Sequence, residues 1–159
     1  MVEDLYRIKC FWEVLLLNVE SIRLINFRNY GDQLIRLNKK LNILVGKNAQ
    51  GKTNFLEAIY VCATGKSFRT NRDRELINFR KSAAYIGAKI EIDNNEKLIE
   101  IKLDVTGKKR IKINSLELKN LKELDSGLNV VVFSPDDLNL IKGGPHERRS
   151  FIDMSISQI

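Results

Sequence analysis

The run Gly46-Lys47-Asn48-Ala49-Gln50-Gly51-Lys52-Thr53 constrains the fold of this chain more than any other feature. A glycine stands at each end of a short loop, and a lysine and a threonine follow the second glycine at fixed spacing. A short, mostly apolar segment, Leu41–Val45, precedes the run, and apolar residues recur after it at three- and four-residue spacing. We therefore predict a buried strand, a tight loop and then a helix that ends near Gly65.

The residue types of this run suit the binding of phosphate groups. Glycines let the backbone approach a ligand closely, successive N–H groups can point inward, and the helix that follows adds its positive N-terminal dipole. We expect Lys52 to reach the β- and γ-phosphates of a nucleotide and Thr53 to place its hydroxyl on Mg²⁺. The predicted nucleotide-binding residues of the loop are Gly46, Lys47, Asn48, Ala49, Gln50, Gly51, Lys52 and Thr53.

Hydrophobic periodicity predicts further elements on both sides of the loop and its helix. Two strands precede the loop, at Val19–Leu24 and Gln33–Leu37, with a turn at 29–32 between them. A meander with one wet face follows, with strands at Ala84–Ile92, Lys97–Asp104 and Arg110–Ile113. Beyond it we expect a short helix within Leu116–Leu124, a buried strand at Leu128–Phe133, a helical turn at 135–138 and a last helix from Pro145 to about Ser157.

Composition limits the classes of protein to which the chain can belong. The 159 residues are 43% hydrophobic, which suits one compact domain. Lys and Arg number 27 against 20 Asp and Glu, and this net charge of +7 favours polyanionic partners or reflects only a basic surface. The composition excludes collagen, disulfide-rich secreted and membrane-spanning classes, and the two cysteines share no metal-ligand spacing. The longest early apolar run, Val14–Leu17, is too short for a signal peptide, so we expect a cytoplasmic protein.

Three other clusters carry charge that a nucleotide or a nucleic acid could use. Arg28 lies in the turn before the loop strand, where its guanidinium could reach phosphates or stack on a base. The segment Lys66–Arg74 holds four basic groups, Lys66, Arg69, Arg72 and Arg74, and it is either a solvated loop or a phosphate-contacting one. The segment Lys142–Arg149 fits anion binding and structural capping equally well. No residue stands out as catalytic.

Several runs resemble the RecF family of ABC/SMC-type ATPases. The similarity covers the chain from about Leu17 to its end. It includes Asn26-Phe27-Arg28-Asn29-Tyr30 and extends through the loop and its helix to Gly65-Lys66-Ser67-Phe68-Arg69-Thr70. It continues at Phe133-Ser134-Pro135-Asp136-Asp137-Leu138 and at Arg148-Arg149-Ser150-Phe151-Ile152-Asp153. The Asn-Ala-Gln inside the loop makes this pattern more specific than a bare phosphate-loop motif.

This resemblance implies a fold and a function. The fold would be α/β, a P-loop NTPase of the ABC/SMC head type, with a core sheet that carries the loop and an antiparallel meander. Proteins of this family bind ATP and Mg²⁺, form homodimers around ATP, hydrolyse it slowly and bind DNA at gapped regions. They work with RecR and RecO, help to place RecA at single-strand gaps, and act in recombination, replication-fork restart and the SOS response. Arg28 would then lie near the nucleotide, and Arg69 in a regulatory or DNA-contacting loop.

The chain departs from the family pattern at both ends. Residues 1–16 precede the point where the pattern begins, and they are either an extension or the product of an upstream start. We expect residues 17–159 to be the N-terminal ATP-binding subdomain. After Thr53 no apolar strand ends in an acidic pair, so we expect the signature motif, the Walker B strand and its general base to be absent from this chain.

Two alternatives remain open from the sequence. One is a DNA-binding or dimerising adaptor that uses ATP only as a ligand, which DNA affinity that persists in Lys52→Ala without ATP would favour. The other is a small nucleotide kinase. The length of the chain fits such an enzyme, but the antiparallel meander of residues 84–113 fits it poorly. We expect binding of ATP with little or no hydrolysis from a site that is only half present.

Overall fold

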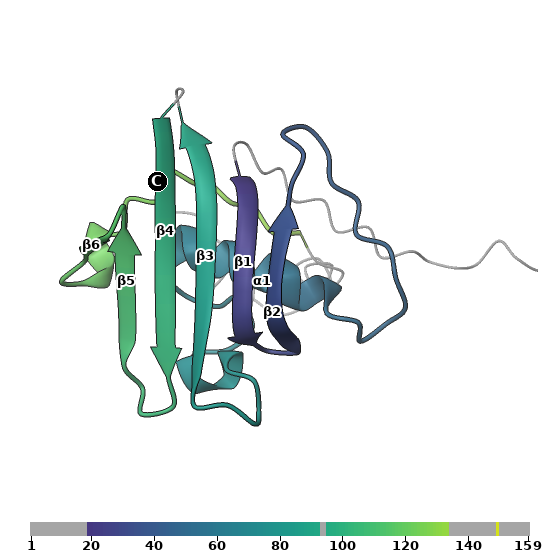
Figure 1. Cartoon of the computed structure of the whole chain (residues 1–159), viewed down its shortest axis with the longest axis horizontal. Helices are drawn as coiled ribbons and strands as arrows, with labels where there is room; N and C mark the ends of the chain where they lie inside the picture. Colours follow the sequence, from purple (N-terminus) through teal and green to yellow (C-terminus); the bar gives the residue numbers. More distant parts are fainter. Residues whose placement is uncertain (1–18, 93–94, 134–148, 150–159) are drawn as a thin grey trace, which may run out of the picture. The chain divides into compact units, whose positions relative to one another are not determined.

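A computed structural model describes residues 19–92, 95–133 and 149. The chain divides into two compact units, one of residues 15–130 and one that joins residues 1–14 to residues 131–159. The first unit holds the strands and helices reported below, and its central feature is a six-stranded antiparallel sheet (Figure 1). The sequence predictions for the helical turn at 135–138 and for the last helix fall almost wholly outside the described residues.

The sheet has the strand order β2-β1-β3-β4-β5-β6, and each neighbouring pair is antiparallel. Its strands are β1 (Val19–Phe27), β2 (Tyr30–Arg36), β3 (Ala83–Ile92), β4 (Asn95–Asp104), β5 (Lys109–Ile113) and β6 (Leu116–Glu117). Five of these six coincide with predicted strands, because alternating apolar and polar residues are a strong local signal. The first turn begins one residue earlier than predicted, at Arg28, so that Tyr30 already belongs to β2.

Apolar and polar residues alternate along the strands, so the sheet has one buried face and one solvent-exposed face. In β4, Ile99, Ile101 and Leu103 are buried, whereas Lys102 between them is exposed. Register places these apolar side chains beside Ile86 and Ala88 of β3, which are fully buried. The prediction of one wet face on the meander is therefore confirmed.

The buried face of the sheet is covered by α1 (Lys52–Thr64), the helix that follows the glycine-rich loop (Figure 1). Residues 55–63 of this helix are all buried. Gly65 ends the helix in the left-handed region at φ 69°, and its N–H donates to the carbonyl of Val61 at 2.8 Å. The predicted helix and its glycine stop are both confirmed. Two short 3₁₀ turns, η1 (Asp73–Leu76) and η2 (Leu121–Glu123), complete the unit.

The predicted strand at Leu41–Val45 is wrong. This segment has no strand structure, and its side chains are exposed, with Val45 at 83%. The side-chain amide of Asn42 instead accepts a hydrogen bond from the backbone N–H of Asn38 and donates one to the Asn38 carbonyl, both at 2.7 Å. A strand buried on both faces also needs partners on its edges, and no described residue pairs with this segment.

Two further predictions are corrected. Leu128–Phe133 forms no strand, and its side chains alternate, with Leu128 and Val130 buried and Phe133 exposed. Leu116–Leu124 is not one helix: it contains the two-residue strand β6 and then η2. In both segments a local run of apolar residues is the only sequence pattern that suggests regular structure. Whether such a run forms a strand depends on another strand with which it can pair. Among the described helices, none is long and apolar enough to span a membrane.

Candidate functional site

The glycine-rich loop stands at the N-terminus of α1, as its motif predicts. Its backbone turns sharply, with Ala49 at φ 63° and Gly51 at φ 103°. A β-carbon at Gly51 would also lie 2.8 Å from the side-chain amide of Asn29. Only glycine satisfies both the positive φ and this close approach. The second fixed glycine of the motif therefore has a structural reason in this chain.

Lys52 lies folded against the loop that precedes it. Its ammonium Nζ donates hydrogen bonds to the carbonyl oxygens of Gly46 and Lys47, both at 2.7 Å. The side chain thus spans the two ends of the loop and holds one positive charge within it. A phosphate oxygen offers the same ammonium a stronger, charge-assisted acceptor than a neutral carbonyl.

The first turn of α1 is open to an anion. Gly51 is the N-cap and provides no side-chain hydrogen bond, and the first turn contains no acidic residue. Backbone N–H groups at such a terminus attract negative charge together with the helix dipole. Thr53 lies in this turn and is half-buried. Its hydroxyl is the kind of oxygen ligand that Mg²⁺ accepts, and its contact with a metal ion stays a prediction. The residues present therefore fit a nucleoside triphosphate with its metal ion.

The corner between β1 and β2 packs against the loop. Tyr30 donates from its hydroxyl to the carbonyl of Gly51 at 3.1 Å, and Asn54 donates from its side-chain amide to Asn29 at 2.8 Å. Burial raises the pKa of Tyr30 above its ordinary value, so the phenol keeps its proton and remains a donor. These bonds fix the end of the loop against the sheet.

A buried carboxylate lies one helical turn below the loop. Glu57 is fully buried, and Arg28 binds it through two hydrogen bonds, Nε to Oε2 at 2.9 Å and Nη2 to Oε1 at 2.7 Å. Ser67 donates to the same carboxylate at 2.6 Å and Arg69 at 3.2 Å. Glu57 therefore joins α1 to the β1–β2 corner and to the segment that follows the helix. Two cations and a hydroxyl compensate the cost of burying its charge.

Arg28 points to Glu57 in this structure. Its third donor, Nη1, binds the carbonyl of Glu75 at 2.7 Å, and its side chain is only 19% exposed. The residue also has a positive φ of 51°, which its backbone bonds with Leu76 and Asn78 hold in place. The predicted contact of Arg28 with a nucleotide is not tested by this arrangement and stays a prediction.

The four predicted DNA-contacting residues all lie on exposed positions of one segment: Lys66, Arg69, Arg72 and Arg74. Arg69 donates to the side-chain carbonyl of Asn54 at 2.7 Å and to Glu57, which brings it close to the loop. Arg72 lies 3.8 Å from Glu75, a loose pair at the surface. The structure therefore brings Arg69 to the nucleotide site and leaves the other three facing solvent, and their contact with DNA stays a prediction.

Sequence reasoning missed Glu57 as the centre of this network. The signal was present, because an acid stands between apolar residues, Phe55 and Ala58, on a helix with no other charge after Lys52. Such an acid must either face solvent or find partners inside. Cys62 is fully buried in the same helix, and burial raises the pKa of its thiol to about 12.

One known family matches most of the chain. Residues 21–152 match the family described as AAA domain, which is more than four fifths of the chain.

Two curated relatives are RecF proteins of other bacteria. The DNA replication and repair protein RecF of Alkaliphilus oremlandii (strain OhILAs) is 50% identical over 141 residues, which is 89% of this chain and 39% of that protein. RecF of Clostridioides difficile (strain 630) is 50% identical over 143 residues, 90% of this chain and 38% of that protein. The chain thus spans about two fifths of the length of these relatives, at their N-terminal end.

Solved structures agree with the sequence comparison and confirm the predicted head-type fold. A structure of the recombination mediator protein RecF with ATP, in the RecFOR pathway, has a TM-score of 0.83 at 37% identity, over 92% of this chain and 40% of that one. A chain from a study of ATP-driven dimerization and DNA-stimulated activation of SMC ATPases has a TM-score of 0.69 at 26% identity, over 85% of this chain and 97% of that one. The chain therefore belongs to the AAA domain family, and over nine tenths of its length it is similar to the N-terminal part of RecF.

Proposed function

We propose that this chain is the N-terminal ATP-binding part of a DNA replication and repair ATPase of the RecF type. The observation that carries the proposal is the conformation of the glycine-rich loop, with Lys52 bound to the carbonyls at its start and an uncapped α1 behind it. A solved RecF structure that contains ATP shares the fold and is 37% identical. We take residues 17–159 as the ATP-binding subdomain.

Different groups of the loop contact different parts of the bound MgATP. Lys52 exchanges its two carbonyl partners for oxygens of the β- and γ-phosphates, and the backbone N–H groups of the loop and of the first turn surround the β-phosphate. Thr53 supplies a hydroxyl ligand to Mg²⁺, which neutralises charge on the phosphates when it is bound with ATP. Glu57 holds Arg28 and Arg69 beside this site, so that two guanidinium groups raise the positive potential around it.

The wider role follows the similarity to RecF. The proposal includes binding of DNA at gapped regions, a homodimer formed with ATP, cooperation with RecR and RecO, and the loading of RecA at single-strand gaps in recombinational repair, fork restart and the SOS response. The net charge of +7 supports a polyanionic partner, and the exposed segment from Lys66 to Arg74 supplies cations for it. The place of action is the cytoplasm, where the chromosome of a bacterium lies.

For this chain alone, the proposal is binding of ATP with little or no turnover. Phosphoryl transfer depends on residues that orient the attacking water and stabilise charge in the transition state. The residues that we assign to the site bind phosphates and the metal ion, and none of them is a general base. Binding and hydrolysis are therefore separable in this protein.

Lys52→Ala tests the nucleotide site. The variant loses a charge-assisted contact to phosphate, so the dissociation constant for MgATP should rise by about tenfold or more in isothermal titration calorimetry. Lys40→Ala is the matched control, because Lys40 is an exposed lysine in the turn before the loop, and its affinity should stay at the wild-type value. Equal affinities in Lys52→Ala and the wild type would contradict the assignment of this loop.

A second measurement tests the separation of binding from turnover. The rate of phosphate release should be close to the uncatalysed rate for this chain, and it should rise when the chain is extended with the C-terminal part of a RecF relative. Equal rates for the two proteins would contradict the proposal that the catalytic groups lie elsewhere.

A further inference from the structure

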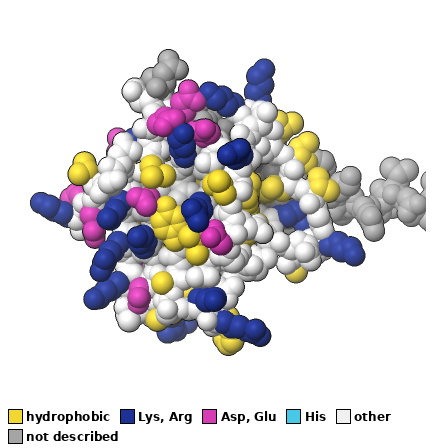
Figure 2. Space-filling view, in the orientation of Figure 1, with side chains coloured by type: hydrophobic (Ala, Val, Ile, Leu, Met, Phe, Trp, Pro, Cys, Tyr) yellow, Lys and Arg dark blue, Asp and Glu magenta, His cyan; other side chains and the backbone are white. Residues whose placement is uncertain are grey.

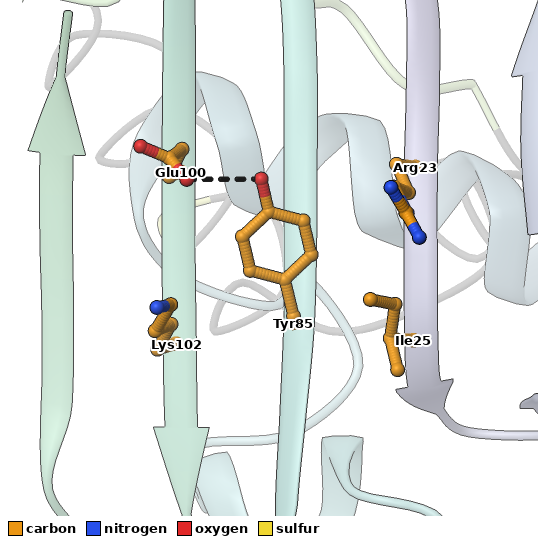
Figure 3. Close-up of a pocket in the computed structure, with 5 residues that line it drawn as sticks. All are labelled: Arg23, Ile25, Tyr85, Glu100 and Lys102. Atoms are coloured by element: carbon orange, nitrogen blue, oxygen red, sulfur yellow. Dashed lines mark hydrogen bonds between the residues drawn. The ribbon is translucent and has the colours of Figure 1, made fainter. Parts of the chain in front are cut away.

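The outer face of the sheet, on the side away from α1, has a hollow of about 350 Å³ that the nucleotide site does not use. It is lined by Arg23 and Ile25 from β1, Tyr85 from β3, and Glu100 and Lys102 from β4. Register places Arg23 and Glu100 on either side of Gly87, and Ile25 and Lys102 on either side of Tyr85. Figure 3 shows these side chains pointing from three neighbouring strands around one aromatic ring.

The ring of Tyr85 lies flat on the sheet. A β-carbon at Gly87 would come within 2.6 Å of the Tyr85 hydroxyl, so the ring rests in the space that this glycine leaves. Figure 3 shows the ring face-on between the side chains of β1 and β4. The hydroxyl donates to Glu100 at 3.1 Å and fixes the ring in this position. One face of the ring therefore covers the strand, and the other faces the hollow.

Several basic side chains lie near the ring, and not all of them are paired with an acidic side chain. Lys102 stands directly opposite Arg110 on the neighbouring strand, and like charges in that position repel. Within the described residues neither of them belongs to an ion pair. Arg23 pairs with Asp32 at 3.2 Å, but both side chains are more than half exposed, so the pair is weak. Figure 2 shows Lys and Arg side chains, with some Asp and Glu side chains among them, around a hydrophobic area on this face.

We propose that this hollow binds one nucleotide of single-stranded DNA, with its base stacked on Tyr85 and its flanking phosphates held by Arg23 and Lys102. The inference rests on the proposed function, and it locates the DNA-binding site on the outer face of the sheet. A flat aromatic ring on an exposed sheet face, bordered by cations, is the arrangement that holds unpaired bases. A phosphate between Lys102 and Arg110 would also relieve their mutual repulsion. In a duplex the base stays within its stack and cannot reach the ring.

Tyr85→Ala tests the stacking contact. The probe is a labelled oligothymidine of about 12 nucleotides, within the range of site sizes for such surfaces, followed by fluorescence anisotropy. We expect the affinity of Tyr85→Ala for this strand to fall about tenfold, whereas Tyr85→Phe keeps the ring and stays near the wild-type value. Gly87→Ala should also weaken binding, because the added methyl group displaces the ring. Affinity for a duplex of the same length should be equal in all four proteins.

Lys102→Ala provides a test that does not depend on the ring. Loss of one phosphate contact should reduce the slope of log K against log salt by about 0.7 for a single strand. Lys122→Ala removes an exposed lysine from η2, outside the hollow, and it should leave the slope unchanged. A wild-type slope in Lys102→Ala, or a wild-type affinity in Tyr85→Ala, would overturn the inference.

The outcomes also separate this inference from the proposed function. If Tyr85→Ala and Lys102→Ala bind the strand as the wild type does while Arg72→Ala and Arg74→Ala do not, the chain binds DNA through its other basic segment and the hollow has no such role. If single strand and duplex weaken equally in Tyr85→Ala, the ring does not stack on an unpaired base. If the wild-type chain binds no DNA at low salt, the proposed function fails together with the inference.

Discussion

The antiparallel sheet with α1 and the segment of residues 37–50 differ in where their interactions come from. Each strand of the sheet finds its hydrogen-bond partner within residues 19–117, and α1 covers the buried face. The segment 37–50 carries most of the phosphate-loop motif, yet it has no strand partner among the described residues and exposes Leu41, Ile43 and Val45. A sequence can therefore specify a glycine-rich loop without specifying the strand that leads to it.

The largest difference between the two regions should lie in their contribution to stability. Ile101 is fully buried in β4, and Ile101→Ala should lower the free energy of unfolding by about 4 kcal/mol. Ile43 is 62% exposed, and Ile43→Ala should change it by less than about 0.5 kcal/mol. Urea denaturation followed by circular dichroism measures both. A cost at Ile43 similar to that at Ile101 would show that the segment is packed and would remove the contrast.

Glu57 connects the two regions, so its loss should have the next largest effect. Glu57→Ala leaves Arg28 beside the core without its partner, and we expect a loss of about 3 kcal/mol in the same denaturation experiment. Arg69→Ala removes the more exposed member of the network, at 41% exposure, and should cost about 1 kcal/mol or less. If Arg69→Ala destabilised the chain as much as Glu57→Ala, the burial of the carboxylate would not be what decides the cost.

The smallest expected effect concerns the outer face of the sheet at high pH. Burial and the hydrogen bond to Glu100 raise the pKa of Tyr85 from 10.0 to about 12. The folded chain therefore keeps this proton at pH values where the unfolded chain has lost it. Its contribution to stability is complete below pH 10 and declines as the pH rises towards 12. Tyr85→Phe should make the alkaline decline shallower in thermal melts between about pH 9 and 12. An unchanged decline would mean that other groups cause it.

The parts of the fold that the sequence predicted are those with strong local signals. Alternation at Ile99–Leu103 predicted a strand with one wet face, and the glycines at 51 and 65 predicted the start and the stop of α1. Leu41–Val45 and Leu128–Phe133 look equally apolar, but whether such runs become strands depends on partners that are distant in the chain. Local pattern carries no information on those partners.

The candidate site was predictable to the same extent. The residues of the glycine-rich loop follow a fixed spacing, so their chemistry could be read directly from the sequence. The ring of contacts around Glu57 joins residues 10 to 29 positions away in the sequence, and no spacing rule connects them. The flat position of Tyr85 depends on Gly87 and Glu100, and only the register of β3 and β4 reveals that arrangement.

The two hydrogen bonds of Lys52 to its own loop have a consequence for selectivity. The carbonyls of Gly46 and Lys47 accept from two of the three donors of the ammonium group. An incoming anion must therefore replace two acceptors at once. A monovalent ion such as chloride offers one centre and gains little from this exchange, whereas a polyphosphate offers several oxygens at the required spacing. We therefore expect the loop to favour polyphosphates over simple anions such as chloride.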